Sequence, residues 1–149
     1  MSSFEIRKVS SEHLEEYGRI YAAAFSGEPW NDPWKPADAA IHVREILESR
    51  QSYGLECVES EKVVGFILGQ SMLFCDGRSF EINDLAVDPA YQGQGIGGIR
   101  MERLMTDLKE MGMTSVDLIT AGEGKLPSFY ERYGFTKAKE VILMGRELK

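Results

Sequence analysis

The spacing of apolar residues in the first third of the chain predicts one strand followed by two helices. Alternation over residues 4–9 predicts a short strand. Residues 14–25 then place apolar side chains on one helical face, behind a serine that suits a helix N-cap. After a break at residues 27–34 that contains two prolines, a second amphipathic helix carries its apolar stripe from Ala39 to Leu47.

The centre of the chain predicts strands that follow one another directly. Residues 55–60 and 62–74 have strand patterns and are joined by a tight turn at Glu61. Asp76-Gly77 marks a second turn, which leads into a strand at residues 79–87. Strands with such short connections pair as an antiparallel sheet.

The last part of the chain returns to alternating helices and strands. A helix that follows a glycine cluster stops at Gly112, and residues 115–119 predict a fifth strand. A short helix is predicted at residues 126–133 and a last strand at residues 141–148. Because the 149 residues contain no internal repeat or low-complexity linker, we expect a single domain over residues 1–149.

The charge of the chain narrows the classes of partner. Lysine and arginine number 17 and aspartate and glutamate 24, so the formal net charge is −7. An acidic surface repels phosphate backbones and attracts cations, which disfavours nucleic acid and favours an amine substrate.

The longest apolar run, Val63 to Gly69, is too short to span a bilayer, so we expect a cytoplasmic protein with no membrane partner.

Cysteines and histidines give no indication of a metal site. Cys57 and Cys75 lie among apolar residues, and no further pair of ligands at zinc spacing accompanies them. We therefore expect two reduced core thiols and no metal. His13 and His42 are isolated within helical patterns, where we expect surface or packing positions without a chemical role.

The most informative segment is a glycine-rich run between a predicted strand and a predicted helix. It consists of Gln92, Gly93, Gln94, Gly95, Ile96, Gly97 and Gly98. Glycines at this spacing let successive backbone N–H groups converge, and the N-terminus of the following helix favours a negative charge. The run therefore predicts a site for a phosphorylated cofactor.

A dinucleotide is one alternative ligand for this run. Gly93, Gly95 and Gly98 also match the dinucleotide fingerprint, and Asp117 lies about where a ribose-binding acid is expected. Against this, several residues separate the strand end at Val87 from the first glycine, and the chain after the run is too short to complete a doubly wound sheet. The spacing disfavours a nicotinamide-dinucleotide site.

The glycine-rich run resembles the acetyl-CoA signature of the GNAT superfamily of N-acyltransferases. That pattern is Gln or Arg, two residues, Gly, one residue, then Gly or Ala, and Gln92, Gly95 and Gly97 fit it. A strand ending in residues 84–89 and the segment Phe129–Phe135 match in the same order. The resemblance implies the GNAT fold, an α+β sandwich with a central mixed, mostly antiparallel sheet, helices on both faces and splayed parallel strands that bind CoA.

The resemblance also implies an activity. It is N-acetyl transfer from acetyl-CoA, the cosubstrate, to a primary amine, expected to be a small cationic acceptor, by direct attack in a ternary complex. The pyrophosphate is expected on the N–H groups of the glycine-rich run, and the pantetheine arm along Leu85, Ala86 and Val87. The N–H of Val87 is then the candidate for polarising the thioester carbonyl. Family members often pair through their terminal strands, which implies a homodimer.

Tyr130 matches the general acid of the family. Helix geometry turns it about 100° from Phe129, which shares the buried face with Tyr133. A phenol keeps its proton at neutral pH and can give it to a departing thiolate. The alternative is a packing tyrosine with a solvated hydroxyl.

Two carboxylates compete for the role of base. Glu81 lies eleven positions before Gln92, the offset of the base glutamate in the histone-acetylating branch of the family, although it can equally be an exposed strand carboxylate. Asp84 lies on the opposite face of the strand by simple alternation, unless a bulge changes the parity. Only one of the two is expected to face the cleft.

The region that receives the acceptor is less defined. Trp30, Asp32 and Trp34 lie in the proline-containing break, where the tryptophans either close the edge of the core or form one wall of a cleft for a cation. Many family members have an asparagine seven positions before the acid tyrosine, where it contacts pantetheine, whereas this chain departs from the pattern with Glu123.

Other functions remain open at this point. A non-catalytic acyl-CoA-binding sensor would bind the cofactor tightly without releasing thiol when amines are added. A peptide or protein N-acetyltransferase would share the cofactor site and differ in its acceptor. A nicotinamide-dinucleotide binder would be stabilised by NAD and not by CoA.

Overall fold

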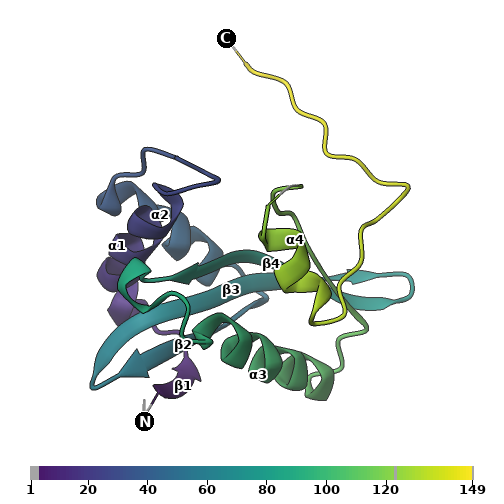
Figure 1. Ribbon diagram of the computed structural model, residues 1–149. Coiled ribbons are helices and arrows are strands. Elements are labelled where there is room, and N and C mark those ends of the chain that lie inside the picture. Colours follow the sequence, from purple (N-terminus) through teal and green to yellow (C-terminus); the bar gives the residue numbers. More distant parts are fainter. Residues whose placement is uncertain (1–3, 123, 149) are drawn as a thin grey trace.

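The computed structural model describes residues 4–122 and 124–148, and in these residues the strands form one mixed sheet (Figure 1). The strands are β1 (Phe4–Lys8), β2 (Ser52–Glu59), β3 (Lys62–Phe74), β4 (Gly77–Val87) and β5 (Ser115–Leu118). They are ordered β1-β2-β3-β4-β5. The first four pair antiparallel with their neighbours, and β5 pairs parallel with β4.

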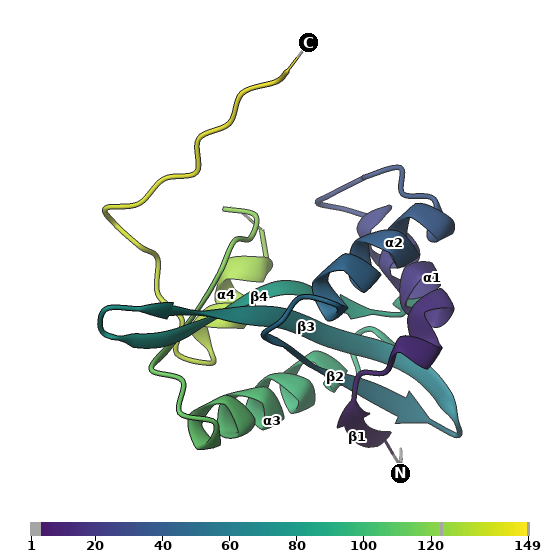
Figure 2. The ribbon, with the colours of Figure 1, turned by 180° about the vertical axis from the view of Figure 1, so that it is seen from behind.

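Helices cover both faces of the sheet, as the resemblance to the GNAT superfamily implies. They are α1 (Leu14–Phe25), α2 (Pro36–Leu47), α3 (Ile96–Glu110) and α4 (Leu126–Glu131), with short 3₁₀ turns at Ser11–His13 and Pro89–Tyr91. One core cluster joins α1 and α2 to the sheet, and a second joins α3 and α4 to its other face. Figures 1 and 2 show the two helical layers on opposite sides. The predicted α+β class and single mixed sheet are confirmed.

The central strand β3 shows why the sheet needs helices on both faces. Residues Val63–Gly69 are all buried, although successive side chains of a strand point to opposite faces. A continuous apolar run of this kind is satisfied only when both faces are covered.

A β-bulge interrupts the pairing of β3 with β4. Leu68 pairs with Asp84, whereas the next residue, Gly69, pairs with Ile82, so Asn83 has no partner in the ladder. An extra residue in one strand shifts the alternation of side chains by one position. The bulge therefore reverses the face on which the end of β4 presents its side chains.

The bulge places both candidate carboxylates on the same face, which corrects the expectation from simple alternation. Phe80 and Ile82 belong to the core on the α3 side, so Glu81 between them points toward the side of α1 and α2. Beyond the bulge, Ala86 belongs to the core beneath α1 and α2, and Asp84 shares its parity. Glu81 and Asp84 thus lie on the α1–α2 face.

The end of β4 has one free edge. β5 pairs with β4 only from Ser79 to Ile82, whereas β3 continues alongside β4 as far as Val87. The N–H of Asp88 donates to the carbonyl of Val64 on β3 at 2.8 Å. Because N–H groups alternate along a strand, those of Leu85 and Val87 point away from β3, toward the edge that β5 leaves open.

Two sequence predictions are wrong at particular positions. Residues 141–148 form no strand; Val141 to Met144 are 73% to 82% exposed, and Figure 1 shows this segment leading away from the sheet. Consecutive apolar residues indicate a tendency to be buried, but a strand also needs a partner edge. Cys75 is exposed at the β3–β4 turn, because its apolar neighbours project with it at the end of the hairpin, whereas Cys57 is buried as expected.

Candidate active site

The glycine-rich run forms an open loop at the start of α3. Gly93 and Gly95 have φ angles of 84° and 79°, a region that L side chains rarely adopt, and Gly95 is the residue immediately before α3. No atom of residues 4–122 and 124–148 lies within 4 Å of where a Cβ would stand at either position, apart from the adjoining residues, so the loop is open on this side. The side-chain amide of Gln92 donates to the carbonyl of Val87 at 3.3 Å, which ties the loop to the end of β4.

The other two glycines of the run allow close packing of α4. A Cβ at Gly97 would lie 3.3 Å from the ring of Phe129, and one at Gly98 would meet the hydroxyl of Tyr133. These rings pack with their centroids 5.3 Å apart over the first turn of α3. The sequence run therefore combines two requirements, loop geometry at its first glycines and helix packing at its last.

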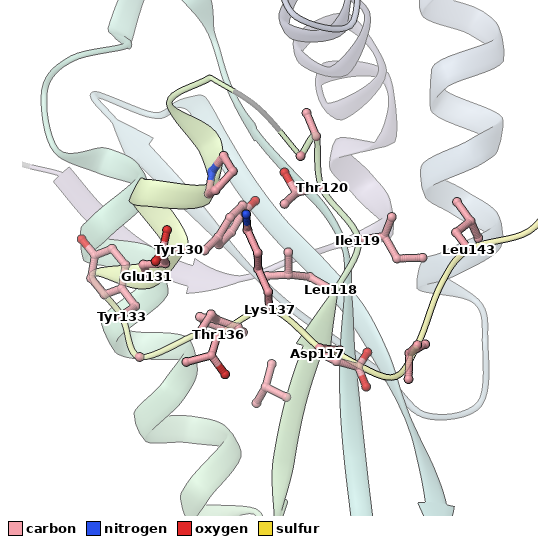
Figure 3. Close-up of a pocket in the computed structure, with 18 of the residues that line it drawn as sticks. Asp117, Leu118, Ile119, Thr120, Tyr130, Glu131, Tyr133, Thr136, Lys137 and Leu143 are labelled. Carbon is pink, nitrogen blue, oxygen red and sulfur yellow. The ribbon is translucent and has the colours of Figure 1, made fainter.

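Tyr130 lies on α4 at the edge of a cavity of about 860 Å³ (Figure 3). The cavity is bounded by the outer edge of β5, by α4 and by the chain after it; the glycine loop does not line it. The Tyr130 ring packs against Phe129 and Phe135, with centroid separations of 5.1 and 5.9 Å. Burial raises the pKa of the Tyr130 phenol, and the charge of Arg100 opposes that rise.

Arg100 is a fully buried cation close to Tyr130. Its side chain is 0% exposed; Nη1 donates to the carbonyl of Ala86 at 3.0 Å, and Nε donates to that of Ile96 at 3.4 Å. Nη2 has no hydrogen-bond partner in the part of the chain that the structure describes. Burial lowers the pKa of the guanidinium to about 10. No carboxylate offsets the desolvation of this charge among the interactions that shift its pKa.

Replacing Arg100 with methionine is expected to stabilise the ligand-free protein. A buried charge without a carboxylate partner is costly, and an apolar side chain of similar length removes that cost, so the free energy of unfolding should rise by about 1–3 kcal/mol. Chemical denaturation measures the change. Arg103→Met is the control, because Arg103 is half exposed and its contact with Asp107 is a surface ion pair worth little. Loss of stability in Arg100→Met would contradict this account of the residue.

The bulge gathers polar groups on the α1–α2 face of β4. The side-chain amide of Asn83 donates to Glu81 Oε1 at 3.2 Å. The other end of that amide, Asn83 Oδ1, is buried without a partner in the described residues. Asp84 is 5% exposed and lies next to them. This face therefore presents carboxylates together with an unused hydrogen-bond acceptor.

His42 of α2 is bound to Asp84, a pairing that the sequence does not indicate. His42 Nε2 lies 2.9 Å from Asp84 Oδ2, and the imidazole is 35% exposed. The hydrogen bond with Asp84 is the main cause that raises the pKa of His42 above its usual 6.5. The expectation of no chemical role for His42 rested on its isolation in the sequence. The partner lies 42 residues away, so no local motif could reveal it.

Of the three predicted acceptor residues, Trp34 lies beside this pair. Trp34 packs against Tyr21 and His42, with ring centroids 5.1 and 5.4 Å apart, and Trp30 packs against Phe25 at 5.6 Å. Asp32, between the two tryptophans, is exposed. The tryptophans thus close the edge of the core while one of them also borders His42. Glu123 lies outside the described residues.

Comparison with known proteins identifies the family. The family model for the acetyltransferase (GNAT) family matches residues 12–135. The chain belongs to this family. Among GNAT relatives, an uncharacterized N-acetyltransferase of Methanocaldococcus jannaschii is 26% identical over 95% of this chain and 64% of its own length. Mycothiol acetyltransferase of Mycobacteroides abscessus is 30% identical over 86% of this chain and 44% of its own length. The chain thus spans about half the length of these relatives.

The GNAT fold is also shown by solved structures. An aminoglycoside acetyltransferase from an uncultured soil metagenomic sample, in complex with sisomicin, superposes with a TM-score of 0.76 at 20% identity. The match covers 98% of this chain and 97% of that one. Within residues 4–122 and 124–148, no helix is long and apolar enough to cross a membrane.

Proposed function

We propose that this GNAT chain transfers the acetyl group of acetyl-CoA to a primary amine of a small cationic acceptor, by direct attack in a ternary complex. The observation that carries the proposal is the continuity of the open glycine loop with the unpaired edge of β4. Gln92 joins the two by its hydrogen bond to Val87, and the edge presents the N–H groups of Leu85 and Val87.

The residues present fit acetyl-CoA. The N–H groups of residues 92–98 and the start of α3, a helix of 15 residues, suit a pyrophosphate. Among the residues that the structure describes, no side chain fills the space at Gly93 or Gly95. The free N–H groups of Leu85 and Val87 are then available to the pantetheine amides and to the thioester carbonyl, with Val87 as the donor that polarises the carbonyl.

Tyr130 is the proposed general acid. Burial raises the pKa of its phenol, so the hydroxyl keeps its proton throughout the neutral range. When the C–S bond of the thioester breaks, the sulfur leaves with the bonding electron pair and takes this proton. The buried charge of Arg100 nearby favours negative charge on both the phenol oxygen and the departing sulfur.

A cationic acceptor is supported by the charge of the chain and by the acceptor-side face. The chain carries a net −7, and Glu81, Asn83 and Asp84 gather next to the free edge of β4. A solved structure with the same fold is an aminoglycoside acetyltransferase in complex with sisomicin. These observations favour ammonium groups on small molecules over neutral acceptors.

The test is release of CoA thiol from acetyl-CoA with a panel of amines. The panel includes an aminoglycoside, a polyamine, a peptide with a free N-terminus and a lysine-containing peptide. We expect release with small cationic amines. Tight acetyl-CoA binding without release across the panel would support the sensor alternative, and release with the peptides alone would support a peptide or protein N-acetyltransferase.

The loop assignment predicts a specific effect of charge at Gly95. Gly95→Asp places a carboxylate where the pyrophosphate is expected, and we expect the Kd for acetyl-CoA to rise about tenfold. The control is Gly95→Asn, which has the same shape and tolerates the same left-handed backbone but carries no charge. Isothermal titration measures both Kd values. Equal Kd values for the two variants would contradict a pyrophosphate at this position.

A further inference from the structure

One polar pair on the acceptor side has the arrangement of a catalytic dyad. Asp84 is 5% exposed, whereas His42 is 35% exposed, so the carboxylate is buried and the imidazole is reachable. A carboxylate only accepts hydrogen bonds, so in the neutral pair His42 Nε2 carries the proton and donates it to Asp84 Oδ2. Nδ1 is then the nitrogen with a free lone pair, and no described residue hydrogen bonds to it.

Asp84 itself is poorly placed to act as the base. One of its oxygens is taken by His42, and burial together with the charge of Asp84 raises the pKa of the Tyr21 phenol, which places Tyr21 near the carboxylate. A buried carboxylate that is bonded to α2 and lies near a phenol of α1 has little freedom to reach a substrate. Its burial and its bond to His42 hold it in place, which suits a residue that orients an imidazole.

The pair lies where the acceptor must approach. Asp84 directly precedes Leu85, whose N–H lines the free edge of β4. The imidazole is flanked by the rings of Tyr21 and Trp34, with centroids 5.0 and 5.4 Å away. Aromatic faces attract ammonium groups, and the unpartnered Asn83 Oδ1 lies on the same face of β4. An ammonium bound there would lie beside His42.

We propose that His42, held by Asp84, is the group that takes the proton from the acceptor ammonium before attack. This inference rests on the proposed acetyl transfer. The ammonium gives one proton to Nδ1 of His42, and its lone pair then forms the C–N bond to the acetyl carbon. The C–S electrons leave on sulfur, which takes the Tyr130 proton. After attack the nitrogen carries one surplus proton, which passes through solvent to the Tyr130 phenolate. His42 gives its proton to solvent, so one proton is released per turnover. Asp84 is a positioning residue.

Every titratable group that acts on the pair favours a protonated imidazole. Asp84 faces His42 from β4, and Glu45 lies on α2 itself. Tyr21 of α1 stays a neutral phenol because burial and Asp84 raise its pKa, and Asp32 acts on Tyr21 from the loop. A raised pKa makes His42 a stronger base than a free imidazole. Because only neutral His42 accepts a proton, activity should fall as the pH drops through a pKa above 6.5.

The first experiment compares His42→Gln with the wild type on primary amines of similar shape whose pKa values range from about 6 to about 10. Glutamine keeps a donor toward Asp84 but takes no proton. At pH 7 we expect kcat/KM to fall roughly tenfold for the most basic amines and to change little for those already neutral. His13→Asn is the matched control, because His13 also contacts a buried carboxylate, Glu56 at 2.8 Å, away from β4's free edge.

The second experiment follows the His42 ring protons by NMR in the protein without substrate. We expect a titration midpoint above 6.5 that falls in Asp84→Asn. If kcat/KM fell equally for all amines in His42→Gln, or if the His42 titration were unshifted, the role of His42 as base would be wrong while the proposed acetyl transfer would stand. If the wild type acetylates no amine, the proposed function itself fails and this inference fails with it.

Discussion

Tyr130→Phe is expected to lower kcat for acetyl transfer by about a hundredfold to a thousandfold while leaving the Kd for acetyl-CoA nearly unchanged. General acid catalysis by a positioned side chain contributes on this scale. The ring keeps its packing against Phe129 and Phe135, at 5.1 and 5.9 Å, so the variant loses only the hydroxyl. Steady-state kinetics and isothermal titration of the same samples separate the two effects.

The pH dependence of Tyr130 gives a second observable. The phenol must be protonated to act, so activity should be lost only as the pH rises through its pKa, which burial raises above 10. The alkaline limb of the wild-type profile should therefore lie above pH 9, and it should disappear in Tyr130→Phe.

Tyr53→Phe is the control for removing a phenol. Its hydroxyl donates to Asp107 Oδ2 at 2.5 Å, and Tyr53 lies on β2, which β3 separates from β4. We expect turnover like that of the wild type. If Tyr130→Phe also turned over normally, Tyr130 would be a packing residue, and the proton for sulfur would have to come from another group.

Local signals in the sequence account for most of the fold. Apolar patterns place the strands and helices close to their observed bounds, because a helix buries one stripe and a strand buries one face or, as in β3, both. Residues 141–148 form no strand although their pattern predicts one, since apolar character indicates a tendency to be buried and not the strand edge that would receive it.

Parts of the candidate site were beyond prediction because they depend on tertiary contacts. The glycine-rich run is a contiguous motif, so its loop could be predicted. The bulge at Asn83 depends on the register between two strands, and it alone decides that Glu81 and Asp84 share a face. The contact of His42 with Asp84 joins α2 to β4 across 42 residues, and the burial of Arg100 depends on α3 lying over Ala86.

Gly69 of β3 lies opposite the bulge of β4, at the shift in register. Gly69→Ala is expected to reduce the free energy of unfolding by about 3 kcal/mol or more. A Cβ at this position would collide with the backbone carbonyl of Glu81 and lie 2.7 Å from the Phe80 ring. Neither can move cheaply, because Phe80 is fully buried and the carbonyl belongs to the strand. Relief requires a shift of β4 relative to β3, which would also displace Glu81 and Asp84. Stability and acetyl transfer should therefore fall together.

Gly27→Ala separates this steric effect from the general effect of replacing glycine. Its nearest neighbour would be the Ala24 carbonyl at 3.9 Å, an ordinary contact, and the backbone there is compatible with alanine. We expect unchanged or slightly higher stability, since alanine restricts the unfolded chain. Thermal and chemical denaturation of both variants make the comparison. A Gly69→Ala protein as stable as the wild type would show that β3 and β4 can be paired without the close approach at the bulge, and the shared face of Glu81 and Asp84 would then lose its structural basis.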